Sequence, residues 1–177
     1  KLNTTHIEEI SSSRNEPEWL KNYRKSSLSV YDSLPIETSP LYNKYTDAKK
    51  MDPEKVSLST NTAETVPAFL QKRLGELENE ICIIQIGTNI HRINLPDELK
   101  SKGLVISSIS DAVQNNFELV KKALEASNSS DDKFTALNNA AFNSGIFIHI
   151  PRNFILDKPI YFLTCLSEDG HSTISRN

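Results

Sequence analysis

The chain has 177 residues, of which 37% are apolar and 24% charged, and its formal net charge is -3 at pH 7. This length suits one domain, or one domain with part of another. The first sixty residues carry as many acidic as basic side chains, so no basic arm for nucleic acid is present. The longest aliphatic run covers only residues 81–84, far short of the about 20 residues that a membrane helix needs. We therefore expect neither a nucleic-acid nor a membrane partner.

The two cysteines, Cys82 and Cys165, are far apart and belong to no disulfide framework or closely spaced metal motif. Residues 1–6 lack the apolar core of a signal peptide. Both features favour a reducing, cytoplasmic location. The chain starts at Lys1 rather than at a methionine and ends at Asn177 in a β-prone stretch, so we expect a fragment of a longer protein.

The N-terminal part is expected to be helical and then irregular. A short helix is predicted over residues 6–13, and a longer one over 15–34, with Asn15 as its cap and Pro17 in its first turn. Its aromatic and aliphatic side chains approximate a 3.6-residue stripe. Residues 36–61 are rich in proline and short polar side chains, which argues against long elements there.

The middle of the chain alternates between helical and β-type patterns. A helix is predicted over 67–77, and a hairpin of strands 81–86 and 90–95 follows around the turn 87–89. A strand over 104–107 precedes three helices. These helices are predicted over 111–115, 117–126 and 132–142, the last capped by Asp131 or Asp132.

After Gly145 the pattern becomes purely β. Strands are predicted over 146–150, 154–156 and 159–166, and a further one from residue 173. Short strands at near-regular spacing suit the coils of a β-solenoid, although a sandwich would give a similar pattern. The chain is thus expected to be α+β, with a helical and irregular segment (1–61), an α/β domain (62–143) and the start of a solenoid core (144–177).

No side chain is assigned a catalytic, cofactor-binding or metal-binding role. Cys82 lies in an apolar strand and is interpreted as a small core side chain. Cys165 shares a strand face with Tyr161 and Leu163 and is interpreted in the same way. His149 falls on the strand face opposite Ile148, where a solvent-facing or hydrogen-bonded histidine is expected.

Other chemical motifs have simple structural explanations. No histidine lies three or four residues from another histidine or a cysteine, and no glycine-rich phosphate loop occurs. Asp131 and Asp132 precede a helix, so capping explains them better than acid–base chemistry. Trp19 and Tyr23 are expected to pack on their own domain, with an anchor for a partner protein as the alternative.

Two stretches of the sequence resemble the SufB/SufD family of iron–sulfur cluster assembly proteins. The first comprises Glu16-Pro17-Glu18-Trp19-Leu20, Tyr23-Arg24, Leu34-Pro35 and Tyr45-Thr46-Asp47. The second runs through residues 103–106, 112–113, 118–122, 132–140, 144–152 and 157–160. The resemblance covers about residues 15–50 and 100–165 and matches the N-terminal portion of the family, with a layout slightly closer to SufD.

The resemblance implies a right-handed parallel β-helix, whose first rungs would begin in residues 144–177. It implies pairing with a SufB/SufD-type partner, or a self-dimer, and binding of a SufC-type ATPase through a C-terminal region. The family's implicated cysteine and histidine lie late in the β-helix, so none is carried over onto this sequence. The resemblance implies no cofactor in this segment, and an iron–sulfur cluster, with flavin as a further option, in the full-length complex.

The sequence therefore predicts a non-enzymatic scaffold component of the SUF iron–sulfur cluster assembly machinery, whose N-terminal region caps the first β-helix rung. One alternative is a β-helix enzyme acting on polysaccharide. Such an enzyme needs converging carboxylates, and the candidates are Asp157, Glu168 and Asp169 in expected turns. Another alternative is a generic protein-binding α/β module.

Overall fold

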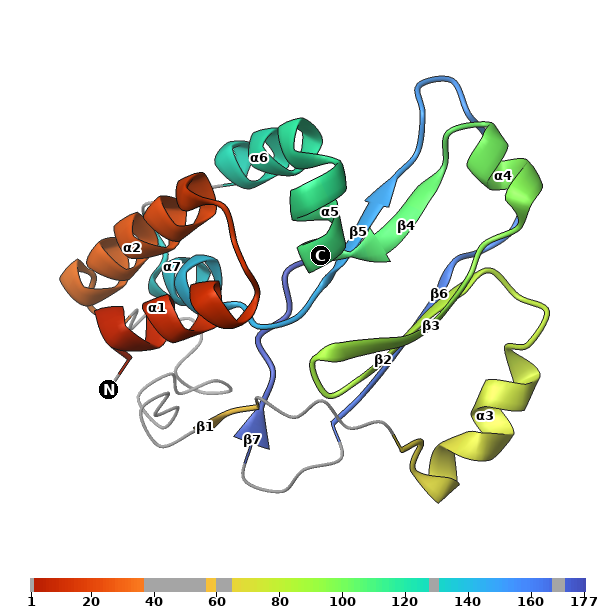
Figure 1. Cartoon of the computed structure of the whole chain (residues 1–177), viewed down its shortest axis with the longest axis horizontal. Coiled ribbons are helices and arrows are strands. Elements are labelled where there is room, and N and C mark those ends of the chain that lie inside the picture. The colour runs from red at the N-terminus through yellow and green to blue at the C-terminus, as the bar shows by residue number, and fades with distance from the viewer. Residues whose placement is uncertain (1, 37–56, 60–64, 128–130, 167–170) are drawn as a thin grey trace, which may run out of the picture.

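The computed structural model describes residues 2–36, 57–59, 65–127, 131–166 and 171–177, and its fold is α+β (Figure 1). The helices are α1 (Thr4–Ser13), α2 (Glu18–Ser33), the 3-10 turn η3 (Ala68–Leu70), α3 (Gln71–Glu76), α4 (Asp97–Ser101), α5 (Ile109–Asn115), α6 (Phe117–Ala126) and α7 (Lys133–Ala141). The strands are β1 (Ser57–Leu58), β2 (Cys82–Ile86), β3 (Asn89–Asn94), β4 (Val105–Ser108), β5 (Ile146–His149), β6 (Tyr161–Cys165) and β7 (His171–Ser172).

Helices α1, α2 and α7 gather at one end of the molecule, and α2 packs along α7 (Figure 1). The two predicted N-terminal helices are confirmed, but the predicted cap of the second is wrong. Pro17 is the residue that precedes α2, while Asn15 adopts a left-handed conformation with φ 50° in the turn after α1. Asparagine tolerates that conformation better than most residues, so Asn15 forms part of the turn and does not cap α2.

The predicted cap of α7 is confirmed, whereas α5 has a cap that was not predicted. The Asp132 carboxylate accepts the backbone N–H of Thr135 at the start of α7. The Ser108 hydroxyl accepts the N–H of Asp111, so α5 begins earlier than predicted, at Ile109. Helix α4 was not predicted, because its five residues are too few to show a periodic apolar stripe.

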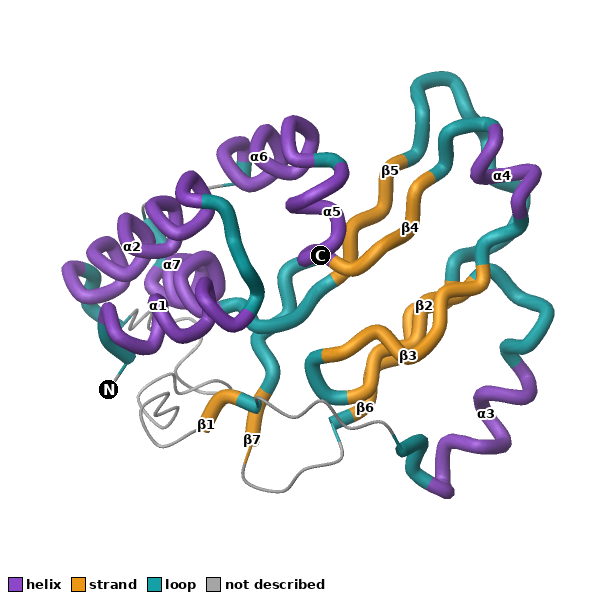
Figure 2. The backbone as a smooth tube through the Cα atoms, in the orientation of Figure 1, coloured by secondary structure: helices purple, strands orange, loops and turns teal. Residues whose placement is uncertain are grey.

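The strands form three small sheets (Figure 2). The predicted hairpin is confirmed as an antiparallel pair of β2 and β3, with a register shift between Ile84 and Gln85. Strand β6 lies on the other side of β2 and runs parallel to it, so the sheet order is β3-β2-β6. Strands β4 and β5 pair antiparallel, and β1 and β7 pair parallel.

The strands after Gly145 do not form consecutive rungs of a parallel β-helix in the described part of the chain. Strand β5 pairs with β4, β6 with β2, and β7 with β1, so each pairs with an earlier segment rather than with its successor. The strand predicted over 154–156 is absent, and residues 154–156 form irregular backbone. The α+β class is confirmed, whereas these three sheets do not show a parallel β-helix.

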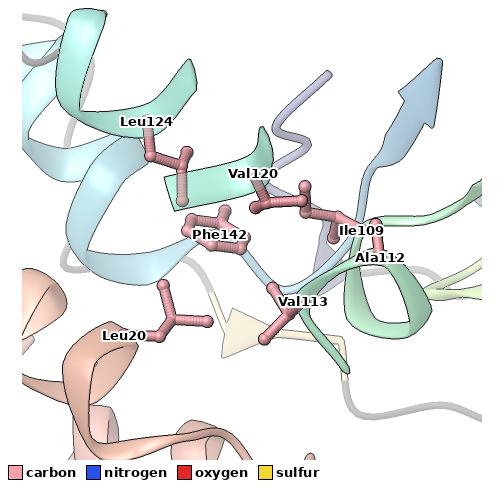
Figure 3. Packing of buried hydrophobic residues seen from close by; sticks show 7 residues of the cluster. All are labelled: Leu20, Ile109, Ala112, Val113, Val120, Leu124 and Phe142. Carbon is pink, nitrogen blue, oxygen red and sulfur yellow. The ribbon is translucent and has the colours of Figure 1, made fainter. Parts of the chain in front are cut away.

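An apolar core joins the helices to the start of β5 (Figure 3). Its buried members are Leu20, Ile109, Ala112, Val113, Val120, Leu124 and Phe142. The Phe142 ring is among the largest fully buried side chains, and burial of such a side chain contributes roughly 1.5–3 kcal/mol. Trp19 and Tyr23 pack against this cluster, as predicted. Phe142, which directly follows α7, therefore packs together with side chains of α2, α5 and α6.

Candidate functional site

Both cysteines lie against the same apolar cluster, at opposite ends of the β2–β6 pair. Cys82 is fully buried, and Cys165 is half-buried beside Tyr161 and Leu163. In the strand register Cys82 is opposite Tyr161, and Cys165 is opposite Ile86. The core position predicted for Cys82 is confirmed, whereas Cys165 packs against the cluster from a half-buried position.

His149 has its predicted alternation but not its predicted exposure. It is half-buried, whereas Ile148 and Ile150 on the other face are 38% and 46% exposed. Ile148 in β5 and Ile150 just after it therefore expose apolar side chains to solvent, while Ile146 on the same face is buried. Within the described ranges no group of three or more histidine, cysteine, aspartate or glutamate side chains is placed to hold a metal ion.

Among the carboxylates weighed for catalysis, those that the structure describes form no cluster. Asp132 caps α7, and Asp157 is exposed in irregular backbone between β5 and β6. Glu168 and Asp169, like Tyr45-Thr46-Asp47, lie outside the residues that the structure describes. Across the described segments, no helix is both long and apolar enough to cross a membrane.

The structure instead brings together a set of polar side chains in the interior, which we call the polar junction: Ser11, Arg14, Glu16, Arg24 and Asn143. Its centre is an ion pair. Arg24 donates from Nε to Glu16 Oε2 (2.8 Å) and from Nη2 to Glu16 Oε1 (2.7 Å). Ser11 Oγ donates to Glu16 Oε2 at 3.0 Å. Such a two-point pair fixes the orientation of both side chains as well as their distance.

The remaining bonding capacity of Arg24 is directed at the end of α7. Its Nη1 donates to the carbonyl of Ala140 at 3.1 Å, and its guanidinium lies 3.8 Å from the centre of the Phe142 ring. Arg24 is thus simultaneously an ion-pair partner, a hydrogen-bond donor and a cation over an aromatic face. A lysine has no planar guanidinium group, so it cannot make these three kinds of contact together.

Arg14 adds a second cation to the junction. It donates to Ser110 Oγ at 2.9 Å and to the Asn143 carbonyl. Burial, and then the nearby Arg24 charge, lower the pKa of Arg14 from its usual range. Arginine nevertheless stays protonated in proteins, so the group acts as a fixed positive donor and does not exchange protons.

Asn143 connects the junction to two distant segments. Its Nδ2 donates to the Ser59 carbonyl (2.9 Å), and its Oδ1 accepts the Ile174 N–H (2.8 Å). Its backbone N–H also donates to the Ile174 carbonyl at 3.0 Å. Segments far apart in the sequence are therefore held together by one buried amide.

The sequence pattern contained a signal for Arg24 that the prediction missed. Arg24 lies four residues after Leu20 and four before Leu28, on the buried stripe of α2. A charged residue on such a stripe needs a buried partner, and Glu16, eight residues earlier, supplies it. No comparable local signal marks Asn143, because its partners come from segments remote in the sequence.

These contacts define an α+β structural module in which the buried polar groups hold chain segments in register. The model of the "SufBD protein N-terminal region" family matches residues 7–162, and the chain belongs to this family. The polar junction lies within these matched residues. Glu16 and Arg24 come from the first region of the resemblance, residues 15–50, and Asn143 lies in the second, residues 100–165.

Curated relatives carry the same family name. One is an iron–sulfur cluster assembly SufBD family protein of Staphylococcus aureus (strain USA300), 29% identical over 170 residues, covering 87% of this chain and 36% of the relative. Another is the protein of that name from Staphylococcus saprophyticus, 30% identical with the same coverage. The chain thus spans about a third of the length of these curated relatives, 36% in each case.

Proposed function

We propose that the protein is a scaffold subunit of the SUF iron–sulfur cluster assembly machinery and that it performs no catalysis itself. The observation that carries this proposal is the family match over residues 7–162, together with relatives named as iron–sulfur cluster assembly proteins. The contacts of the polar junction support a structural role, because its ion pair and amide are used in joining α1, α2 and α7 to residues 59 and 174.

The partners follow from the family. We expect a SufC-type ATPase, and a SufB/SufD-type subunit or a second copy as the pairing partner, in the cytoplasm. The cluster, with flavin as a further option, would be held by the full-length complex rather than by this region. The slight preference for a SufD-like protein stays a prediction.

The proposed contribution of this region is to cover the first rung of a parallel β-helix. The parallel pair of β2 and β6 supports the idea, because β6 is an edge strand of its sheet. An edge strand offers backbone groups that a further parallel strand can use. In a chain as long as the curated relatives, we expect the β-helix to follow this region.

Affinity purification of the full-length protein from its own host tests the proposal. We expect the ATPase and the pairing subunit to be recovered with it, and depletion of the protein to lower the activity of iron–sulfur enzymes. Recovery without any ATPase would contradict the proposal. Turnover of polysaccharide by the purified protein would favour the β-helix enzyme instead.

Two variants test whether this region matters to assembly. Arg24→Ala disrupts the polar junction, whereas Lys121→Ala changes only an exposed side chain on α6, whose ion pair with Glu125 spans 4.0 Å. We expect Arg24→Ala to lower recovery of the pairing subunit and Lys121→Ala to leave it unchanged. Equal recovery with both variants would show that partner pairing does not depend on the folded N-terminal module.

A further inference from the structure

Residues 171–177, which we call the C-terminal strap, contact segments from separate parts of the chain. Figure 1 shows the strap running from β7 to the C-terminal mark beside α5. Its residues 171–176 are half-buried, and the Ile174 side chain packs against the apolar cluster that contains Phe142. The family match ends at residue 162, so the strap lies outside the matched residues although it packs on them.

Asn143 and Ser144, which follow α7, hold the middle of the strap. Asn143 Oδ1 accepts the Ile174 N–H (2.8 Å), and the Ile174 carbonyl accepts the Asn143 N–H (3.0 Å). The Ser144 N–H donates to the Ile174 carbonyl (3.3 Å) and its carbonyl accepts the Arg176 N–H (3.0 Å), which makes Ser144 and Ser175 a parallel bridge. Asn143 and Ser144 are buried, so the strap supplies hydrogen bonds that water does not reach in the folded chain.

The start of the strap is held by the segment that contains β1. Strand β7 pairs parallel with β1 over two residues, and the Ser59 N–H donates to the Ser172 carbonyl at 2.8 Å. The Ser59 carbonyl in turn accepts the Asn143 side-chain N–H at 2.9 Å. An isolated pair of strands is at best marginally stable, so this short pairing depends on its neighbours. Asn143 is therefore bonded both to the strap and to the segment with which the strap pairs.

The end of the strap is held at the start of β5. Asn177 Oδ1 accepts the Ile146 N–H at 3.1 Å, and a Cβ at Gly145 would collide with the Arg176 backbone, so the two segments are in direct contact. Opening of the whole strap admits water to all of these polar groups. Partial opening leaves some of them buried and unbonded, which is unfavourable. The contacts thus favour release of the strap in one step.

We propose that the C-terminal strap, residues 57–59 and residues 143–146 open and close as one cooperative unit, with Asn143 at its centre. The N-terminal module is then completed by residues that follow the matched range 7–162. Any event that releases the strap also releases β1 and the residues after α7, so these segments are conformationally coupled. The unit is a property beyond the proposed role in cluster assembly, because its argument uses only contacts within this chain.

Hydrogen exchange of the full-length protein tests the unit at the amides of Ser59 and Arg176. The Ser59 N–H bonds to the start of the strap, and Arg176 lies near its end. We expect the two protection factors to agree within roughly threefold and to fall with the same slope as urea is added, because one opening exposes both amides. A larger difference, or unequal slopes, would show that the two ends open independently and would overturn the proposal. This comparison needs no variant.

Asn143→Ala tests the central residue, and Asn94→Ala is the matched control. Asn94 also donates from its side-chain amide to two backbone carbonyls, but these lie in the turn before β2, and its strand β3 belongs to a different sheet from the strap. We expect Asn143→Ala to speed exchange at both Ser59 and Arg176 by at least about tenfold, although neither N–H bonds to Asn143. Asn94→Ala should leave both rates unchanged.

Two results with these variants would contradict the cooperative unit. One is an acceleration by Asn143→Ala that is confined to one of the two amides or absent from both. The other is an equal acceleration by Asn94→Ala, which would assign the effect to general destabilisation of the module. Either result would stand whether or not the ATPase still co-purifies, so failure of the unit and failure of the proposed function are distinguishable. If Asn143→Ala does not fold, the exchange comparison in the natural protein decides.

Discussion

Arg24 and Glu16 form an ion pair that is closed off from water, with side chains 0% and 6% exposed. Glu16 lies just before the start of α2, and Arg24 lies two turns along that helix, so the pair fixes the chain where it passes from α1 to α2. Ser11 supplies a further hydrogen bond to the carboxylate. Each charge is compensated by the other, and removing either leaves an isolated buried charge.

We predict that Arg24→Ala lowers the free energy of unfolding by about 3–5 kcal/mol, the usual cost of breaking a buried pair on one side. Arg24→Lys keeps the charge but loses the second bond to Glu16 and the planar contact with Phe142, so its loss should be intermediate. Urea unfolding of the protein measures all of these values. A loss below about 1 kcal/mol for Arg24→Ala would contradict a closed ion pair.

A double substitution distinguishes the interaction between Glu16 and Arg24 from the separate contribution of each side chain to stability. Glu16→Met with Arg24→Met removes both charges together, and apolar replacement of a buried pair is often close to neutral. We expect the double variant to lose clearly less stability than the sum of the two single variants. Simple additivity would show that the two side chains do not interact.

Local sequence patterns predicted the elements that depend on interactions between residues close together in the chain. The apolar run 81–86, the glycine turn and the return strand predicted the β2–β3 hairpin, and Asp132 marked the start of α7. The partners of β5, β6 and β7 could not be predicted in this way. Strand β6 pairs with β2, which lies far earlier in the chain, and a period-two pattern carries no information on its partner.

The same dependence on long-range contacts explains which parts of the candidate site could be predicted from the sequence. The apolar role of Cys82 followed from its neighbours, because a cysteine within an isoleucine run is most often buried. The polar junction depends on contacts between residues 11–24, 140–143 and 174, which only the folded chain brings together. The resemblance named only Glu16 and Arg24 of its five residues as family features, and it did not indicate that these two touch.

Gly145 is predicted to tolerate no side chain. Its φ is +147°, and a Cβ there would collide with the backbone of Arg176, its carbonyl oxygen above all. Gly145→Ala should therefore lower the free energy of unfolding by more than about 2 kcal/mol, through both the unfavourable conformation and the backbone clash. Thermal unfolding followed by circular dichroism measures the change.

Gly75 is the matched control for Gly145. It lies in α3, and no neighbouring atom lies within 4 Å of the position that an alanine Cβ would take, so alanine fits there without a clash. Gly75→Ala should raise the free energy of unfolding by about 0.5–1 kcal/mol, since alanine favours the helix. Similar destabilisation by both substitutions would argue against the close approach of Arg176 to Gly145.

Lys133 is predicted to stabilise the end of α2. Its Nζ donates to the carbonyls of Tyr31 (2.5 Å) and Leu34 (2.6 Å) and lies 4.2 Å from the centre of the Tyr31 ring. A cation at a helix C-terminus satisfies free carbonyls and favours the helix dipole. Lys133→Met should therefore cost about 1–2 kcal/mol of unfolding free energy in urea titrations.

The control for Lys133 is a lysine with an exposed partner. Lys121→Met breaks only the exposed 4.0 Å pair with Glu125 and should change stability by less than about 0.5 kcal/mol. If the two methionine variants unfold at the same urea concentration, Lys133 does not hold the end of α2.

The two cysteines are predicted to differ in reactivity. Cys82 is fully buried in β2, with its Sγ 3.7 Å from the Leu77 carbonyl, whereas Cys165 is half-buried on the edge strand β6. Alkylation of the native protein should modify Cys165 first, and Cys82 at least about a thousandfold more slowly, at a rate set by opening of β2. Mass spectrometry of peptides at successive times measures both rates. Equal rates would mean that β2 is not enclosed.

Tyr23 gives stability a dependence on alkaline pH. Burial raises its pKa above the ordinary value of 10.0, against a smaller opposing effect of Arg176 and Arg24. The folded state therefore holds the phenol proton more tightly than the unfolded state does. This contribution to stability is complete below pH 10, the unfolded pKa, and is lost as pH rises through the folded pKa.

Tyr23→Phe removes this titration while keeping the ring that packs on the core cluster. It also removes the 3.4 Å hydrogen bond from the phenol to the Leu124 carbonyl, so the variant should be slightly less stable at neutral pH. Above pH 10 its free energy of unfolding should fall less steeply than that of the natural protein. Urea unfolding at a series of alkaline pH values measures both slopes. Identical slopes would mean that the Tyr23 phenol titrates alike in the folded and unfolded chains, so that burial has no effect on its pKa.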